Sequence, residues 1–364
     1  MKKLIALILC LATLLLAVGC KKDKYPEIKS TAEEARVMMS FSIGKDTYEM
    51  KYELYRALFL NFSGYYDNGD KSFWDKPESK EKLNQLNNKI LEYTLDIFAV
   101  LHVSKSIGFD PYSKEAEAMI SEYIAKSVEG DGDTVIGFGG NYDAYLESIK
   151  AANMNYSVQK LLYRYSIAYD KIIAHYQGTS NENNPGENQS GALVYTPDDV
   201  FAFYSGDNAV RISPVVIDAT YFTYERAKEI RDEIASAPNT AEALKIAISK
   251  TAANESDINN GVIIGTHTLD KAYYTDVTIA AFNIGINETS DVITVVTDTG
   301  AEYWILYKRE KSDEHFHSHY NTMAGVFASQ KIGEIIDAAK TSLNNSRSET
   351  SDYKNLKHSG ISMK

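Results

Sequence analysis

The chain has 364 residues, of which 50 are acidic and 38 are basic, so its formal net charge is −12. A negative balance of this size argues against nucleic acid and anionic lipid surfaces as binding partners. The length is enough for two modest domains, each with its own core. The 26 tyrosines favour broad, weakly selective contact surfaces, because each combines an apolar ring with a polar hydroxyl.

Residues 1–19 are predicted to be a signal peptide. Met1-Lys2-Lys3 is a basic start, and the apolar run from Leu4 to Val18 is too short for a stable transmembrane helix. Ala17-Val18-Gly19-Cys20 resembles the lipobox of bacterial lipoproteins, in which the cysteine becomes the lipidated first residue. The resemblance implies an extracytoplasmic protein held to the bacterial membrane through Cys20, with residues 20–30 as a tether. A plain secretory signal with an incidental cysteine is the alternative.

The sequence contains two cysteines, Cys10 and Cys20. Loss of the signal peptide removes the first, and acylation blocks the second, so no free thiol would be left. Disulfides, thiol catalysis and metal sites with cysteine ligands are then excluded.

Residues 31–176 are predicted to form a helical domain that begins with a short strand at 38–43. Its clearest helix has apolar residues at helical spacing from Leu83 to Leu101, and Gly108 follows as a stop. Further helices are expected after the capping residue Ser113, at 142–154 and at 157–176.

This order of elements, with a long helix ending in Ser106-Ile107-Gly108-Phe109, resembles the N-terminal domain of SurA-like and PrsA-like extracytoplasmic chaperones. In that family the helical bundle cradles unfolded segments of other proteins. The resemblance therefore implies unfolded or secreted client polypeptides as partners. The alternative is that the tyrosines and leucines of this domain are core residues and nothing more.

Residues 177–195, rich in Asn, Gly, Ser and Glu, are predicted to be a flexible linker. Residues 196–311 then follow the order β-α-α-β-α-β-β, which predicts a four-stranded antiparallel sheet covered by helices. Thr196 and Pro197 open its first helix as cap and first helical residue. The last two strands form a hairpin across Asp298-Thr299-Gly300.

Several short segments of this second domain look like the second half of a parvulin-type peptidyl-prolyl isomerase domain. They are Asn259-Asn260-Gly261, Ile279-Ala280-Ala281-Phe282, Gly285, Ser290-Asp291-Val292 and Tyr303-Trp304-Ile305-Leu306. The resemblance covers roughly residues 210–311 and implies catalysis of rotation about X-Pro bonds, which is slow without a catalyst. Together the two resemblances predict an α+β fold, in which the C-terminal helix returns to complete the N-terminal bundle.

Parvulins place two histidines and a Met/Phe pocket around the proline ring. Here the first histidine position falls on Tyr221, or on Asp218 in a longer-loop register, and the second falls on Trp304. The pocket positions fall on Tyr273 and Val277, which leaves Phe282 as the one matching aromatic residue. The family's histidine pair is therefore absent.

Rotation about the bond needs no nucleophile, only a dry cradle whose polar groups favour the twisted amide. The resemblance thus assigns a candidate catalytic set of Tyr221, Tyr273, Thr297 and Trp304, with Val277 and Phe282 as the proline pocket. The same hydroxyls could equally be surface or packing groups. His267 could replace the missing imidazole, or it could be a loop residue without such a role.

Residues 312–343 are predicted to be a connector and a helix that returns to the bundle, and residues 344–364 to be a disordered tail. In an extended connector His315, His317 and His319 would share one face and could converge on zinc or copper. A solvated connector is the alternative, and we expect no metal or other cofactor.

The sequence has no nucleophile elbow, no phosphate-binding loop and no metalloprotease helix motif. We therefore expect a membrane-anchored extracytoplasmic folding factor whose isomerase activity is weak or lost. An active isomerase and a non-catalytic scaffold or metal-binding lipoprotein are the alternatives.

Overall fold

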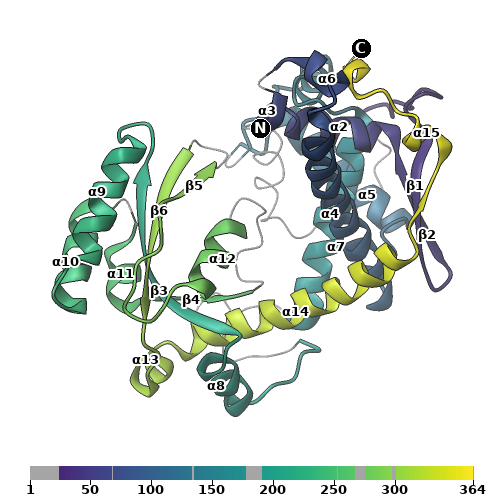
Figure 1. Cartoon of the computed structure of the whole chain (residues 1–364). Coiled ribbons are helices and arrows are strands. Elements are labelled where there is room, and N and C mark those ends of the chain that lie inside the picture. Colours follow the sequence, from purple (N-terminus) through teal and green to yellow (C-terminus); the bar gives the residue numbers. More distant parts are fainter. Residues whose placement is uncertain are drawn as a thin grey trace. The chain divides into compact units, whose positions relative to one another are not determined.

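The structure is a computed structural model that describes residues 24–67, 69–132, 135–177, 191–251, 253–266, 275–296 and 301–363. It is an α+β fold with two compact units (Figure 1). The helical unit contains the described residues up to 173 and those from 335 onward, and the sheet unit contains those from 174 to 334. The predicted fold class is confirmed, including the return of the C-terminal helix to the helical unit.

The helical unit is built around α4, a long helix whose apolar residues are buried at the predicted spacing. Leu86, Ile90 and Leu101 are among its fully buried side chains, and Ser113 caps α5 by accepting the backbone N–H of Ala116. The helices of this unit are α2 (Tyr52–Phe62), α3 (Gly64–Asp67), η1 (Lys71–Asp75), α4 (Ser79–Ser106), α5 (Lys114–Glu129), α6 (Tyr142–Ala151), most of α7 (Tyr156–Gln177) and the end of α14 (Tyr320–Asn345).

A small antiparallel sheet with strand order β2-β1-β7 lies in the same unit. Strands β1 (Val37–Ile43) and β2 (Asp46–Lys51) form a hairpin, and β7 (Ser348–Glu349) pairs with β1. Tyr48 and Met50 of β2 point into the core, which is the alternation expected of a half-buried strand.

The C-terminal residues after 343 are ordered, which corrects the expected disordered tail. They form β7, α15 (Ser351–Lys354) and η3 (His358–Gly360), and Ile361 is 1% exposed. The sequence of this segment has no periodicity that would predict these elements. They are held by contacts with residues some three hundred positions earlier, such as the hydrogen bond between His358 and Tyr55.

The sheet unit has four antiparallel strands in the order β4-β3-β6-β5, as predicted. The strands are β3 (Ala209–Asp218), β4 (Val262–Gly265), β5 (Ile293–Val296) and β6 (Ala301–Arg309). The helices are α8 (Pro197–Ser205), α9 (Tyr224–Ala235), α10 (Thr240–Lys250), α11 (Glu255–Asn260), α12 (Thr275–Asn283), α13 (Asp313–Ser318) and the beginning of α14. Thr196 and Asp199 form a capping box on α8.

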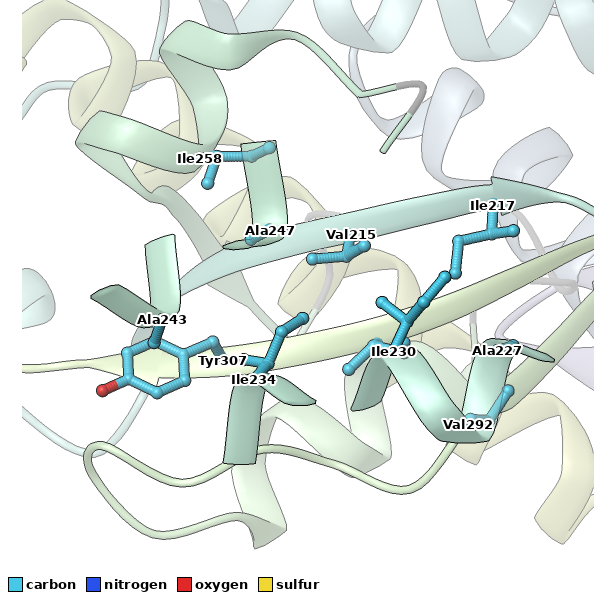
Figure 2. Packing of buried hydrophobic residues seen from close by; sticks show 11 residues of the cluster. Val215, Ile217, Ala227, Ile230, Ile234, Ala243, Ala247, Ile258, Val292 and Tyr307 are labelled. Atoms are coloured by element: carbon cyan, nitrogen blue, oxygen red, sulfur yellow. The ribbon is translucent and has the colours of Figure 1, made fainter. Parts of the chain in front are cut away.

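Helices cover both faces of the sheet, because alternate residues of its strands point to opposite sides. On one face Val215 and Ile217 of β3 pack with Ile230 and Ile234 of α9, as Figure 2 shows. On the other face Val210, Ile212 and Leu306 pack with α12. We refer to this second side as the α12 face.

Candidate functional site

The α12 face brings three of the predicted site residues together. Val277 and Phe282 of α12 and Trp304 of β6 belong to one apolar cluster, in which Val277 is fully buried and the two aromatic rings are half-buried. Trp304 lies opposite Val216 of β3 and Ile293 of β5 in the strand register. The cluster is an apolar platform at the middle of the sheet.

A pair of carboxylates borders this platform. Asp218 and Glu302 are direct partners in the register of β3 and β6, so two like charges face each other across the strands. Glu302 accepts the indole N–H of Trp304 at 2.9 Å, and Asp218 accepts the backbone N–H of Thr220 at 2.7 Å. The platform therefore has negative charge and hydrogen-bond acceptors along one border.

Tyr221 lies apart from this cluster, on the turn between β3 and α9. Its side chain is 80% exposed, and the neighbouring Phe222 and Tyr224 are each 42% exposed. Tyr224 packs edge-on against Tyr303, with ring centroids 5.8 Å apart. We call Tyr221, Phe222 and Tyr224 the aromatic turn. Sequence reasoning named Tyr221 and missed its two neighbours, although three aromatic residues just around the capping residue Thr223 were a usable signal.

The aromatic turn borders a cleft of about 550 Å³ between the end of β3, the start of α9 and the end of α10. Its apolar lining includes Ile217 and Ile230, and its polar lining includes Arg226 and Lys250. The remaining lining residues are Val216, Asp218, Tyr221, Phe222, Ser249 and Thr251. A mixed lining of this kind suits a flexible chain that carries both apolar and charged side chains.

The strand edge along this cleft is already capped. Thr251 Oγ1 accepts the backbone N–H of Val216 at 2.8 Å and donates to the Val216 carbonyl at 3.1 Å. Two residues earlier on the same edge stands Pro214, which has no N–H to donate. A segment bound here would contact side chains rather than extend the sheet.

Four of the predicted residues lie outside the described residues: Cys20, His267, Tyr273 and Thr297. Within the described part of the chain, no helix is both long enough and apolar enough to span a membrane.

The three histidines of the connector do not share one face, because the segment is a helix rather than the extended chain that was expected. Ser312 caps α13, and the rings of His315 and His319 stack with centroids 4.5 Å apart. His317 contacts Phe316 instead. Over the residues that the structure describes, no group of three or more potential ligand side chains is placed to hold a metal ion.

His315 is a buried structural residue. Its Nδ1 lies 3.2 Å from the Tyr204 hydroxyl. Burial lowers the pKa of His315 to about 4, and the nearby Arg211 and His319 act in the same direction. The imidazole is therefore neutral at pH 7 and helps to join α8 to α13.

The apolar cluster of the α12 face offers packing surface rather than groups for proton transfer or nucleophilic attack. The described members of the apolar cluster are Val, Ile, Ala, Leu, Phe and Trp, so they carry no imidazole, thiol or hydroxyl group. What they offer is a surface for apolar side chains, with carboxylates beside it for N–H groups or cations.

Known proteins were compared with the chain in three ways. No family model matches the sequence, and no curated protein matches it. Among solved structures, the chain is similar to the foldase PrsA from Streptococcus pneumoniae, with 14% identity, 86% of this chain and 96% of the other covered, and a TM-score of 0.27. It is also similar to PrsA from Bacillus subtilis (14% identity, 72% and 87% covered, TM-score 0.24) and to PrsA from Bacillus cereus (17% identity, 74% and 89% covered, TM-score 0.23).

Proposed function

We propose that this protein is an extracytoplasmic folding factor that binds unfolded polypeptide segments and is anchored to the bacterial membrane through a lipid on Cys20. The observation that carries the proposal is the aromatic turn, with Tyr221 80% exposed beside a cleft of about 550 Å³. Exposed aromatic side chains next to a concave surface are typical of binding sites. The net charge of −12 would keep a complex with an apolar client soluble.

Suppression of aggregation tests this proposal. The protein without its signal peptide should suppress aggregation of an unfolded client at stoichiometric ratios. Replacing Tyr221 and Phe222 together with alanine should weaken client binding about fivefold, since exposed aromatic residues contribute strongly at interfaces. Ile286→Ala is the matched control, because Ile286 is 57% exposed and does not line the cleft. If the protein suppresses aggregation at no ratio, the proposal is wrong.

On X-Pro bonds we propose little or no acceleration. Trp304 stands where the resemblance expects an imidazole, and its indole N–H is directed to Glu302. The pocket position at Val277 is filled by a small, fully buried side chain. Differential binding of a twisted amide should therefore be weak. Refolding limited by proline isomerisation measures this directly, and Tyr221→Phe and Tyr273→Ala should abolish any residual rate. Robust catalysis that survives both substitutions would contradict the site assignment.

The anchor is tested separately. Cys20→Ser should abolish lipidation, because the thiol is the only acceptor in the lipobox-like segment. When cells grow with a labelled fatty acid, the wild-type chain should carry the label and the Cys20→Ser variant should not. An unlabelled wild-type chain would remove the lipoprotein part of the proposal and leave the folding activity untouched.

A further inference from the structure

A second aromatic surface lies in the helical unit, on α2 and η1. We define the aromatic patch as Tyr55 and Phe59 of α2 with Trp74 of η1. Phe59 contacts Trp74 at a centroid distance of 5.3 Å and Tyr55 at 6.0 Å. The indole N–H of Trp74 is satisfied internally by Asp67 at 2.7 Å. The three rings therefore form one contiguous, buried aromatic cluster, in which Asp67 fixes the orientation of Trp74.

The C-terminal residues 351–363, which we call the strap, cover this patch. In Figure 1 the yellow end of the chain runs past β1 and ends beside α2. Tyr353 meets Tyr55 edge-on at 5.7 Å, and the ring of His358 lies 5.5 Å from that of Phe59. Ile361 is almost completely buried. The strap therefore supplies part of the packing that keeps Tyr55 and Phe59 buried.

Two polar contacts hold the strap in position. The Tyr55 hydroxyl donates to Asn87 Oδ1 at 2.7 Å, so it accepts the N–H at Nε2 of His358 at 3.0 Å. Ser359 donates to Asp75 at 2.7 Å. In addition, Ile361 donates its backbone N–H to His358 within the strap itself. The regular structure that the strap contributes is one turn of α15 and the short η3.

The strap does not pack continuously against the body of the unit. A polar cleft of about 290 Å³ separates strap residues Asp352, Asn355 and Lys357 from Arg36 and Tyr52. A segment that covers an aromatic surface, is anchored by a few side chains and has an open cleft along its middle can be displaced at modest cost.

We propose that the aromatic patch is a second binding surface for unfolded polypeptide, and that the strap occupies it as a built-in competitor. This inference rests on the proposed function as a folding factor. The strap itself shows the chemistry that the patch accepts: a segment of short helical turns with an aromatic side chain, a hydrogen-bond donor for Tyr55 and an aliphatic residue, placed as Tyr353, His358 and Ile361 are. Client polypeptides with such segments bind to the aromatic patch when the strap dissociates from it.

A labelled peptide copying residues 351–363 is the probe, measured by fluorescence anisotropy. It should bind a chain truncated after Thr350, which lacks the whole strap, at least about tenfold more tightly than the full chain, because a tethered competitor acts at roughly millimolar effective concentration. Ile361→Ser in the full chain removes the apolar anchor and should give an intermediate affinity. Lys354→Ala, at an exposed position of the strap, is the matched control and should behave as the full chain.

Equal affinity for the full and truncated chains would overturn the inference, provided that both unfold cooperatively. If the truncated chain fails to fold, the Ile361→Ser variant decides: peptide binding no tighter than to the full chain overturns the inference. Loss of peptide binding with intact suppression of aggregation would reject the patch and keep the proposed function. Tight peptide binding without any suppression of aggregation would reject the proposed function and keep the patch.

Discussion

The two units hold their half-buried cations in different ways. In the helical unit the cations face carboxylates: Arg56 pairs with Glu34 at 2.7 Å, and Lys340 of α14 pairs with Asp96 of α4 at 2.6 Å. In the sheet unit several cations of β3 and β6 donate to backbone carbonyls instead. Arg211 donates from Nε to the Asn260 carbonyl at 2.8 Å and from a terminal nitrogen to that of Glu310 at 3.1 Å.

Most of these carbonyl acceptors lie at the ends of short helices, whereas Glu310 follows β6. Arg309 donates to Asn259 at the end of α11, and Lys308 donates to Phe282 and Ile284 at the end of α12. Lys311 donates to Gly206 just after α8. Burial lowers the pKa of all four cations, which are Arg211, Lys308, Arg309 and Lys311. The pKa of Arg211 falls to about 10. The last carbonyl groups of a helix have no partner within the helix and lie at the negative end of its dipole, so hydrogen bonds from cationic side chains are favourable there.

The comparison shows two ways of joining elements. Ion pairs in the helical unit connect segments remote in sequence, including the returning helix α14. Cations in the sheet unit fasten short helices to the sheet and compensate the helix dipoles, so they need no carboxylate. The backbone after α11 approaches β3 closely at Gly261. Its φ is +74°, and a Cβ there would lie 3.0 Å from the Arg211 side chain.

The largest effect is expected from Arg56→Met in the helical unit. Removing this cation takes away the ion-pair partner of the partly buried Glu34, which keeps only neutral hydrogen bonds from Thr31 and Asn155, and should destabilise the unit by about 3 kcal/mol. Urea unfolding measures the loss. Lys76→Met, which breaks the exposed pair with Asp70, is the control. Equal effects of the two substitutions would show that burial does not strengthen the ion pairs of this unit.

Arg211→Met should cost about 2 kcal/mol in the sheet unit, because it removes charged hydrogen bonds to the carbonyls of Asn260 and Glu310. The same denaturation experiment applies. The carbonyl acceptors do not titrate, but Arg211 also helps to lower the pKa of His315, so the loss should become smaller below about pH 6.5 as His315 of the variant takes up a proton more easily. A loss of the same size at every pH would mean that Arg211 does not act on His315.

The strap should respond to acid through His358. Burial lowers the pKa of His358 to about 4, below its ordinary value of about 6.5. The unfolded chain therefore binds a proton that the folded chain does not, so stability is full above about pH 6.5 and falls by about 2 kcal/mol by about pH 5. His358→Asn should flatten this part of the pH profile of the melting temperature. An unchanged profile would exclude His358 as the titrating group.

The smallest effect is expected from Glu229→Ala, which removes a carboxylate near Arg226 on the exposed surface of α9. Exposed pairs contribute little, so the free energy of unfolding should change by about 0.5 kcal/mol or less. A loss above about 1 kcal/mol would show that surface ion pairs matter in the sheet unit as well, and the contrast between the units would be weaker.

Much of the architecture could be predicted from local patterns. Apolar spacing predicted α4, and Ser113 and Thr196 predicted the starts of α5 and α8. The order of strands and helices, through its resemblance to parvulin domains, predicted a four-stranded antiparallel sheet. Each of these signals lies within a few residues of the element it specifies, because capping and amphipathicity are local properties of the backbone.

Only the tertiary structure decided the features that join distant residues. It placed Val277, Phe282 and Trp304 in one cluster and Tyr221 in another region, and it set Asp218 against Glu302. It also ordered the strap, whose sequence has no pattern of its own and whose order comes from Tyr55 and the patch around it. Such contacts depend on strand register and on chain return, which no short window of sequence contains.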